Sequence, residues 1–126
     1  MAKEIITVPN APQLPFSPAV RAGDYVFLSG QGGFVDSEDR EVNGIEAQTR
    51  QCLENVKNVL KAAGANLDDV VKVTIFLKNV DDFAKMNEIY QGYFSKDYPA
   101  RSTAVTDLVI PNMLVEIECI AYAPQP

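Results

Sequence analysis

Hydrophobic positions recur with two different periods along the chain, and the change of period separates expected strands from expected helices. Apolar residues alternate with polar ones over 70–78 and 113–122, which is typical of strands that bury one face. The residues expected on the buried face of the first run are Val71, Val73, Ile75 and Leu77. Shorter runs rich in β-forming residues predict further strands over 3–8, 24–31 and 101–108.

Apolar spacings of three and four residues predict two helices, one over 45–63 and one over about 81–95. Asn43 and Glu46 are spaced as a capping box for the first helix, and Gly64 fits the position just past its end. The stripe of the first helix consists of Ile45, Cys52, Leu53, Val56, Val59, Leu60 and Ala63. The core face expected for the second consists of Phe83, Met86, Tyr90, Tyr93 and Phe94.

This order of elements predicts an α+β fold in one domain, residues 1–126, with both helices on one face of a sheet. The last strand indicates how the other face is covered. One side of it carries a smooth apolar row, Val115, Ile117, Cys119 and Ala121. The other side mixes apolar bulk with two carboxylates: Leu114, Glu116, Glu118, Ile120 and Tyr122. Such a face is too apolar for water and too charged for an ordinary core, so we expect it to pack on further copies of the chain.

The segment that follows the first strand, residues 9–18, has a proline at every third position. This spacing favours an extended path over the surface, although such a segment can also be a ligand for a proline-binding domain. Farther along, Gly30, Gly32 and Gly33 lack the lysine and the helix of a phosphate-binding loop, so we assign them to turn geometry.

Composition excludes several classes of function. The formal net charge is −6 and the eleven basic residues are scattered, which argues against a nucleic-acid partner. No stretch is apolar enough to span a membrane, and a cytoplasmic protein is expected. Cys52 and Cys119 are expected to be buried thiols and not a disulfide. The chain has no histidine, which excludes a Ser-His-Asp triad, a Cys-His pair and the usual zinc site.

Arg101 and Glu116 are the strongest candidates for chemistry, because they stand on consecutive predicted strands and can be neighbours in one sheet. They can form a structural ion pair. Alternatively, the guanidinium binds the carboxylate of a small acid while Glu116 handles a proton or a water molecule. Asn87 lies on the apolar stripe of the second helix, and Ser29 lies near a strand end; each can also serve only local hydrogen bonds.

Four stretches in order along nearly the whole chain resemble the RidA (YjgF) family of imine and enamine deaminases: NAPQLPFSPAV, FLSGQ, DFAKMNEIYQGYF and PARSTAV followed by VEIECIAY. The resemblance implies a chorismate-mutase-like α+β fold with a mixed six-stranded sheet. It also implies a homotrimer in which three sheets form a central barrel, with a site in each cleft between subunits. The implied reaction converts 2-imino acids or their enamine tautomers to 2-keto acids and ammonia, without a metal or an organic cofactor.

The resemblance further implies that Arg101 binds the substrate carboxylate and that Glu116 positions or activates the attacking water. Ser29 and Asn87 are expected to line the pocket. Phe16 and Thr103 stand where many members have tyrosine and cysteine, which puts the substrate range in question. Two other functions stay open: a regulatory trimer that binds a keto acid without turnover, and an RNA-cleaving inhibitor of translation, which the acidic charge disfavours.

Overall fold

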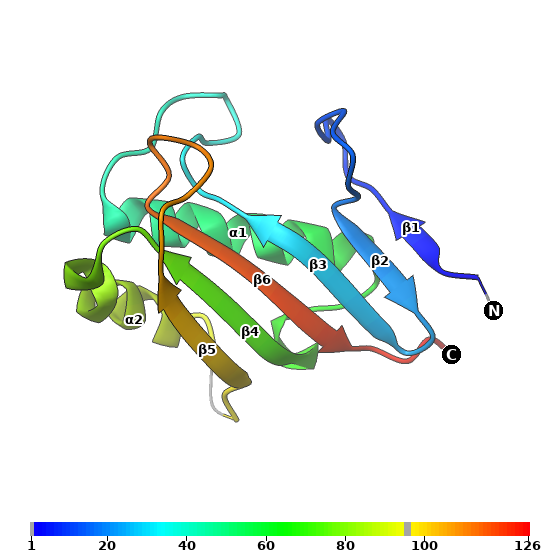
Figure 1. The fold of residues 1–126 in the computed structure, drawn as a ribbon. Coiled ribbons are helices and arrows are strands. Elements are labelled where there is room, and N and C mark those ends of the chain that lie inside the picture. The colour runs from blue at the N-terminus through cyan, green and yellow to red at the C-terminus, as the bar shows by residue number, and fades with distance from the viewer. Residues whose placement is uncertain (1, 95–96) are drawn as a thin grey trace.

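A computed structural model describes residues 2–94 and 97–126 of the chain (Figure 1). One sheet contains six strands in the order β1-β2-β3-β6-β4-β5. The strands are β1 (Glu4–Ile6), β2 (Ala19–Ala22), β3 (Tyr25–Gln31), β4 (Val70–Leu77), β5 (Ala100–Val105) and β6 (Val115–Tyr122). The helices are α1 (Ile45–Ala62) and α2 (Phe83–Gln91), and short 3-10 turns precede β4 and α2.

The sheet is mixed, as the resemblance implied. Strands β4 and β5 pair in parallel, and the other pairings are antiparallel. A parallel pair needs a crossover connection, and α2 supplies it between β4 and β5. Strand β6 lies between β3 and β4, so the last strand of the chain occupies the middle of the sheet (Figure 1).

Both helices cover one face of the sheet and bury its apolar side chains, as the periodicity predicted. The apolar row of β6 is fully confirmed, because Val115, Ile117, Cys119 and Ala121 are all at most 4% exposed. The stripe of α1 is confirmed too, with each of its seven predicted members buried. Both cysteines are buried free thiols, as expected. In the described residues, no helix is long and apolar enough to cross a membrane.

The other face of the sheet is left open. Tyr25, Phe27, Val71 and Tyr122 are each 43–45% exposed there, and the Tyr25 and Tyr122 rings pack 5.2 Å apart. Large apolar side chains gathered on one exposed sheet face indicate a surface that another molecule covers. This agrees with the mixed character predicted for the outer side of β6.

The predicted capping box at the start of α1 is wrong. Gly44 is the N-cap, with a φ of 88°, and no side chain caps the helix. A capping box occurs instead at Asn66 and Asp69, before β4. At the other end, Gly64 takes a φ of 78° just past the C-cap, as predicted, and this left-handed conformation favours glycine.

Strand β2 was not predicted, because its four residues are too few to show a period. It is held partly by Arg21, which is only 5% exposed. The guanidinium donates hydrogen bonds to Ala123 O at 2.8 Å and to Ala63 O at 2.7 Å. One buried side chain therefore joins β2, the end of α1 and the C-terminal segment.

Two side chains predicted for the core lie outside it. A register shift between Val70 and Lys72 leaves Val70 buried and Val71 45% exposed, so one predicted core position in β4 is wrong. Phe83 is 43% exposed because α2 begins there, later than predicted, after the 3-10 turn Val80–Asp82. The helix also ends at Gln91, earlier than the predicted end at about 95, which itself lies outside the described residues.

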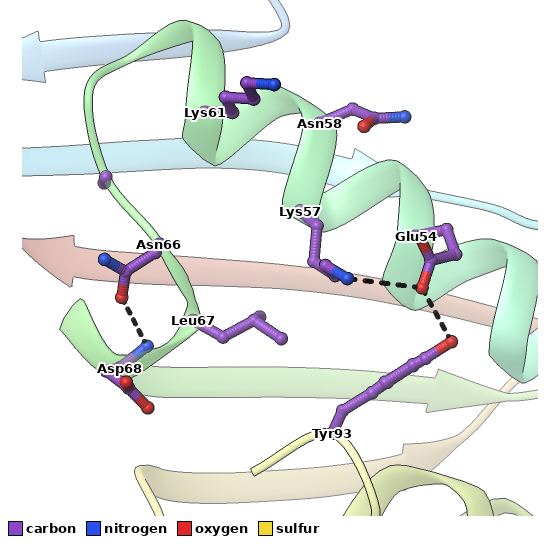
Figure 2. Close-up of a pocket in the computed structure, with 9 residues that line it drawn as sticks. Glu54, Lys57, Asn58, Lys61, Asn66, Leu67, Asp68 and Tyr93 are labelled. Atoms are coloured by element: carbon purple, nitrogen blue, oxygen red, sulfur yellow. Dashed lines mark hydrogen bonds and ion pairs between the residues drawn. The ribbon is translucent and has the colours of Figure 1, made fainter.

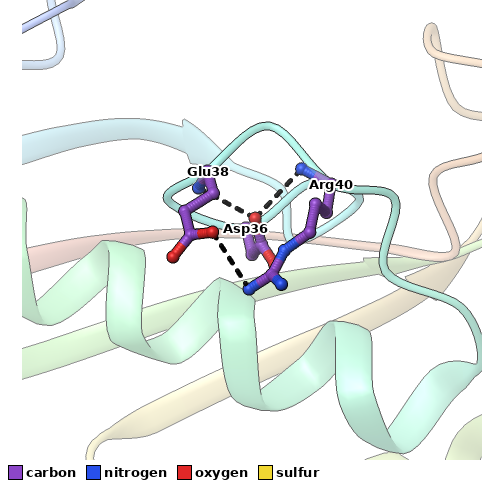
Figure 3. A network of polar contacts seen from close by, with 3 residues as sticks. All are labelled: Asp36, Glu38 and Arg40. Atoms are coloured by element: carbon purple, nitrogen blue, oxygen red, sulfur yellow. Dashed lines mark hydrogen bonds and ion pairs between the residues drawn. The ribbon is translucent and has the colours of Figure 1, made fainter.

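The loop between β3 and α1 is a compact turn organised by Asp36 (Figure 3). The Asp36 carboxylate accepts hydrogen bonds from the backbone N–H groups of Glu38 and Arg40, at 2.8 and 3.0 Å. It also pairs with the Arg40 guanidinium at 3.1 Å. These contacts pair the Asp36 carboxylate within its own loop, and Val35 and Glu41 form a β-bridge across the loop.

Candidate functional site

An open groove of about 590 Å³ lies where three segments distant in the sequence meet. The segments are the proline segment (residues 9–18), the end of β3 with the loop after it, and the loop that leads into β6. The lining residues are Pro12, Leu14, Phe16, Ser29, Gly30, Gly32, Phe34, Val109, Ile110, Met113, Glu116 and Glu118. The groove is therefore an apolar surface with two carboxylates, and it contains three of the predicted site residues.

Glu116 projects from β6 on the face opposite the helices and lies against the backbone of Gly30 in β3. Its partial burial raises the pKa of the carboxyl group, and the nearby Glu118 carboxylate raises it further. Both effects disfavour the charged form. A carboxyl group with a raised pKa can take up and release a proton closer to neutral pH than an exposed glutamate can.

Ser29 uses its hydroxyl to hold the proline segment in place. The hydroxyl donates to Ser17 O at 2.6 Å, and the Ser29 N–H donates to Pro18 O at 3.0 Å. Phe16, 55% exposed, is thereby held at the groove. The segment is not extended throughout, because Asn10 adopts a φ of 61°. Ser29 can still accept a hydrogen bond from a ligand through its oxygen.

Arg101 lies at the edge of the sheet on the helix side. Its partner in β4 is Val73, which is buried beneath the helices. The guanidinium carbon lies 4.9 Å from the centre of the Tyr90 ring and 5.7 Å from that of Phe83. Among the described residues no carboxylate forms an ion pair with it. The aromatic faces thus hold the cation in place, while its N–H groups form no ion pair with a carboxylate of the described residues.

Thr103 follows Arg101 by two residues on β5, and Asn87 stands on α2 between Phe83 and Tyr90, the two residues whose rings Arg101 contacts. Thr103 Oγ1, Asn87 Oδ1 and the hydroxyl of Tyr90 are buried, and within the described parts of the chain none has a hydrogen-bond partner. Buried polar atoms are nearly always paired, so three such atoms near one free guanidinium indicate an incomplete site. Burial also raises the pKa of Tyr90 to about 12, so this hydroxyl stays protonated.

A single chain does not bring Arg101 and Glu116 together, contrary to the expectation that they are neighbours in the sheet. Strand β4 lies between their strands, where Arg101 pairs with Val73 and Glu116 with Phe76. Because side chains alternate along a strand, partners three residues apart point to opposite faces. The ion-pair interpretation is therefore wrong, and the predicted residues form two half-sites: Glu116, Ser29 and Phe16 in one, Arg101, Thr103 and Asn87 in the other.

Sequence reasoning missed Gln48, which links two loops that each contribute lining residues to the groove. This fully buried amide donates to Val42 O at 3.0 Å and to Asn112 O at 2.8 Å, and accepts from the N–H of Leu114 at 2.8 Å. It thus links the loop before α1 to the loop before β6. The available signal was a polar residue among the apolar positions of the α1 stripe.

A second pocket, of about 520 Å³, lies between α1 and the turn that precedes β4 (Figure 2). Glu54 accepts a hydrogen bond from the Tyr93 hydroxyl at 2.9 Å and pairs with Lys57 at 3.6 Å. None of the predicted site residues lines this pocket, and its central charges pair with one another. The groove at Glu116 is the better candidate.

The sequence profile of the family described as Endoribonuclease L-PSP matches residues 8–123. The chain belongs to this family. A RutC family protein of Pyrococcus horikoshii is 46% identical over 123 residues, which is 95% of this chain and 98% of that protein. A 2-iminobutanoate/2-iminopropanoate deaminase of Dermatophagoides farinae is 42% identical and matched over 94% of each chain.

Solved structures of the L-PSP family share the fold. The YjgF gene product of Escherichia coli superposes with a TM-score of 0.86 at 34% identity, over 94% of this chain and 98% of the other. The resemblance to the RidA (YjgF) family and the expected chorismate-mutase-like fold are therefore confirmed. The family's description and its members' names differ in the activity they state, so the activity of this chain has to be argued from its own site.

Proposed function

We propose that this protein hydrolyses reactive 2-imino acids and their enamine tautomers, of the 2-aminoacrylate and 2-aminocrotonate type, to 2-keto acids and ammonia. The observation that carries the proposal is the Arg101 guanidinium, which aromatic rings hold and no described carboxylate neutralises. A cation held without a protein anion is suited to binding the carboxylate of a small acid. The name of the Dermatophagoides relative supports the same reaction.

The proposed active sites lie between the subunits of a homotrimer whose open sheet faces form a central barrel. Two features support this assembly. The face opposite the helices exposes large apolar side chains, Tyr25, Phe27 and Tyr122 among them. In addition, the two half-sites lie on opposite faces of one sheet, so a second copy of the chain is needed to place Arg101 of one subunit near Glu116 of another.

In the proposed reaction, Arg101 forks onto the substrate carboxylate and fixes the position of C2. Glu116 accepts a proton from a water molecule while the water oxygen bonds to C2 and the C=N electron pair moves to nitrogen. The proton then passes to the nitrogen and gives a carbinolamine, which carries OH and NH2 on C2. Glu116 next transfers the remaining hydroxyl proton to the nitrogen, so the C–N bond breaks, ammonia leaves with that electron pair, and the C2–O bond becomes a carbonyl. The imine carbon is already electrophilic, so orientation and charge placement are sufficient without a stronger nucleophile.

The remaining residues are assigned to substrate binding. Asn87 and Thr103 offer buried oxygens beside Arg101, while Ser29 and Phe16 bound the groove beside Glu116. The proposal requires no metal or organic cofactor. RNA cleavage is disfavoured, because the groove carries Glu116 and Glu118 and the chain has a net charge of −6, both of which repel phosphates.

The test is to generate 2-aminoacrylate with a dehydratase and to follow its decay with and without the protein. Faster decay is expected, and Arg101→Ala is expected to abolish the acceleration. Lys72→Ala is a matched control on the neighbouring strand, since the Lys72 side chain donates a hydrogen bond to Ser102 Oγ at 3.0 Å and is assigned to neither half-site. Unchanged decay together with keto-acid binding would establish the alternative, a binding trimer without turnover.

A further inference from the structure

The pairing of β3 with β6 is irregular opposite Glu118, two residues after Glu116 on the same strand. Leu28 pairs with Cys119 and Gln31 pairs with Ile117. Two residues of β3, Ser29 and Gly30, therefore oppose one residue of β6. Two residues opposite one is the definition of a β-bulge, and a bulge changes the direction in which the neighbouring side chains point.

Gly30 lies directly beneath the Glu116 side chain. A Cβ atom built on Gly30 would overlap Glu116 Oε2 and would lie 2.8 Å from Cδ and 3.0 Å from Cγ. Real Cβ atoms essentially never come closer than 3.0 Å to another heavy atom, and Oε2 and Cδ would both be nearer than that, so the carboxylate occupies the space that any other residue's side chain would fill. Glycine is not required here for its backbone, since Gly30 is not among the glycines with positive φ.

We propose that Gly30 is a positioning residue for Glu116. Because glycine has no side chain, it leaves a space over the β3 backbone, called the seat below, that holds the Glu116 carboxylate in the groove. The effect of this contact on catalysis rests on the proposed deaminase function. The contact between Gly30 and Glu116 does not depend on that function. With alanine at position 30, the carboxylate has to leave the β3 backbone and move toward solvent. It then no longer faces the position where water meets the substrate.

The seat also keeps the carboxylate partly buried. The other titratable group that lines the groove is Glu118, on the same strand. On α1, across the sheet from Glu116, burial raises the pKa of the Cys52 thiol, and the charge of Glu116 contributes to the rise. Displacement toward water reduces the desolvation that raises the pKa of Glu116. The pKa of Glu116 is therefore expected to fall in Gly30→Ala.

The test is a double-mutant cycle of Gly30→Ala and Glu116→Ala, in which a pair that interacts directly gives non-additive effects. Gly30→Ala is expected to lower the denaturation midpoint when Glu116 is present and to have little effect when residue 116 is alanine. It is expected to lower kcat by about tenfold or more with KM changed less than about twofold, since a misplaced base acts on the chemical step. In the Glu116→Ala background, no further loss of kcat is expected.

Gly32→Ala is the matched control. Its added Cβ would meet the end of the Met113 side chain at 2.6 Å and the Phe34 ring at 3.1 Å, and its three nearest atoms all belong to these two side chains. Its effect on the midpoint is therefore expected to be the same with glutamate or alanine at 116.

An equal loss of stability from Gly30→Ala in both backgrounds would overturn the proposal, because the glycine would then serve the backbone alone. If Gly30→Ala fails to fold, recovery of folding in the double variant supports the seat, and failure of both overturns it. If the wild-type protein has no deaminase activity, the proposed function fails. In that case the double-mutant cycle in denaturation midpoints and an NMR measurement of the pKa of Glu116 still test the role of Gly30, because neither depends on catalytic activity.

Discussion

At the scale of single residues, the two central candidates are governed by opposite environments. The Arg101 guanidinium lies against two aromatic rings and forms no ion pair with a described carboxylate. Glu116 is partly desolvated and lies near a like charge, so its charged form is disfavoured. A guanidinium is suited to binding a substrate carboxylate. A carboxyl group whose charged form is disfavoured is suited to carrying a proton.

Arg101→Lys is expected to raise KM by about tenfold or more and to lower kcat less. Lysine keeps the charge but cannot form two parallel hydrogen bonds to a carboxylate, and each lost charge-assisted bond costs about 1.5–3 kcal/mol. Steady-state kinetics with enzymatically generated imines measures both constants. A variant with an unchanged KM would show that Arg101 does not bind the substrate carboxylate.

Glu116→Gln is expected to change how stability depends on pH. The pKa of Glu116 is raised on folding, so the native state holds this proton more tightly than the unfolded chain. The stabilisation is present below the ordinary value of 4.5 and is lost as the pH rises through the folded pKa. Wild type should therefore lose stability relative to Glu116→Gln as the pH increases above about 4.5.

Urea denaturation of both proteins between pH 4 and pH 7 measures this difference. Glu118→Gln is a useful companion variant, because it removes the neighbouring charge and should lower the pKa of Glu116. A difference between wild type and Glu116→Gln that stays constant over the whole range would contradict the raised pKa.

At the scale of elements, α1 organises the site without contributing a group to it. Its buried Gln48 holds the loops on either side of the groove, and Asn55 donates to Gly32 O at 2.8 Å. Gly33 lies so close to α1 that a Cβ there would lie 2.6 Å from the Cys52 backbone nitrogen. The assignment of this glycine to turn geometry was therefore incomplete, because close packing against the helix also requires it.

Gln48→Leu is expected to lower the free energy of unfolding by about 2–4 kcal/mol. Leucine fits the buried volume but leaves Val42 O, Asn112 O and the Leu114 N–H without partners, and each buried unpaired group costs about 1–3 kcal/mol before relaxation. Gln51→Leu, one turn away on the same helix, loses only a contact with Asn55 and should cost much less. Equal losses in the two variants would show that Gln48 is not a specific clamp.

At the scale of the whole molecule, one chain holds two incomplete half-sites and one uncovered apolar face. Closing that face against copies of the same chain removes exposed aromatic surface from water, which is the main favourable term in association. The same assembly can bring Arg101 and Glu116 of different chains to one substrate. Under the proposed function, catalysis is a property of the oligomer.

Mixing Arg101→Ala and Glu116→Ala subunits is expected to restore activity. Each variant is inactive alone, but a mixed trimer contains one interface with both residues intact. Random reassembly of equal amounts should recover about a quarter of the wild-type rate, by counting subunit arrangements in a closed ring. Refolding the two together and assaying imine decay measures this, with each variant refolded alone as the control. No recovery from well-formed oligomers would place the whole site within one chain.

The fold was largely predictable because most of its elements are long enough to show a period. Helix α1 and strand β6 were identified with nearly correct bounds, since each repeats its pattern over two or more turns or pleats. Strand β2 is too short for this, and the irregularity at Val71 interrupts the alternation that the prediction assumed. Phe83 shows the same limit at a helix end, where a 3-10 turn delays the helix.

The amino-acid sequence by itself determined the α+β class, the core faces, the family and the chemical types available for catalysis, because these depend on local periodicity and on which residues are present. Only the tertiary structure decided which groups meet. Strand β4 separates Arg101 from Glu116, the bulge in β3 places Gly30 under Glu116, and Gln48 joins two loops. These relations depend on strand order and register, which arise from packing across the whole chain and leave no periodic trace in any one segment.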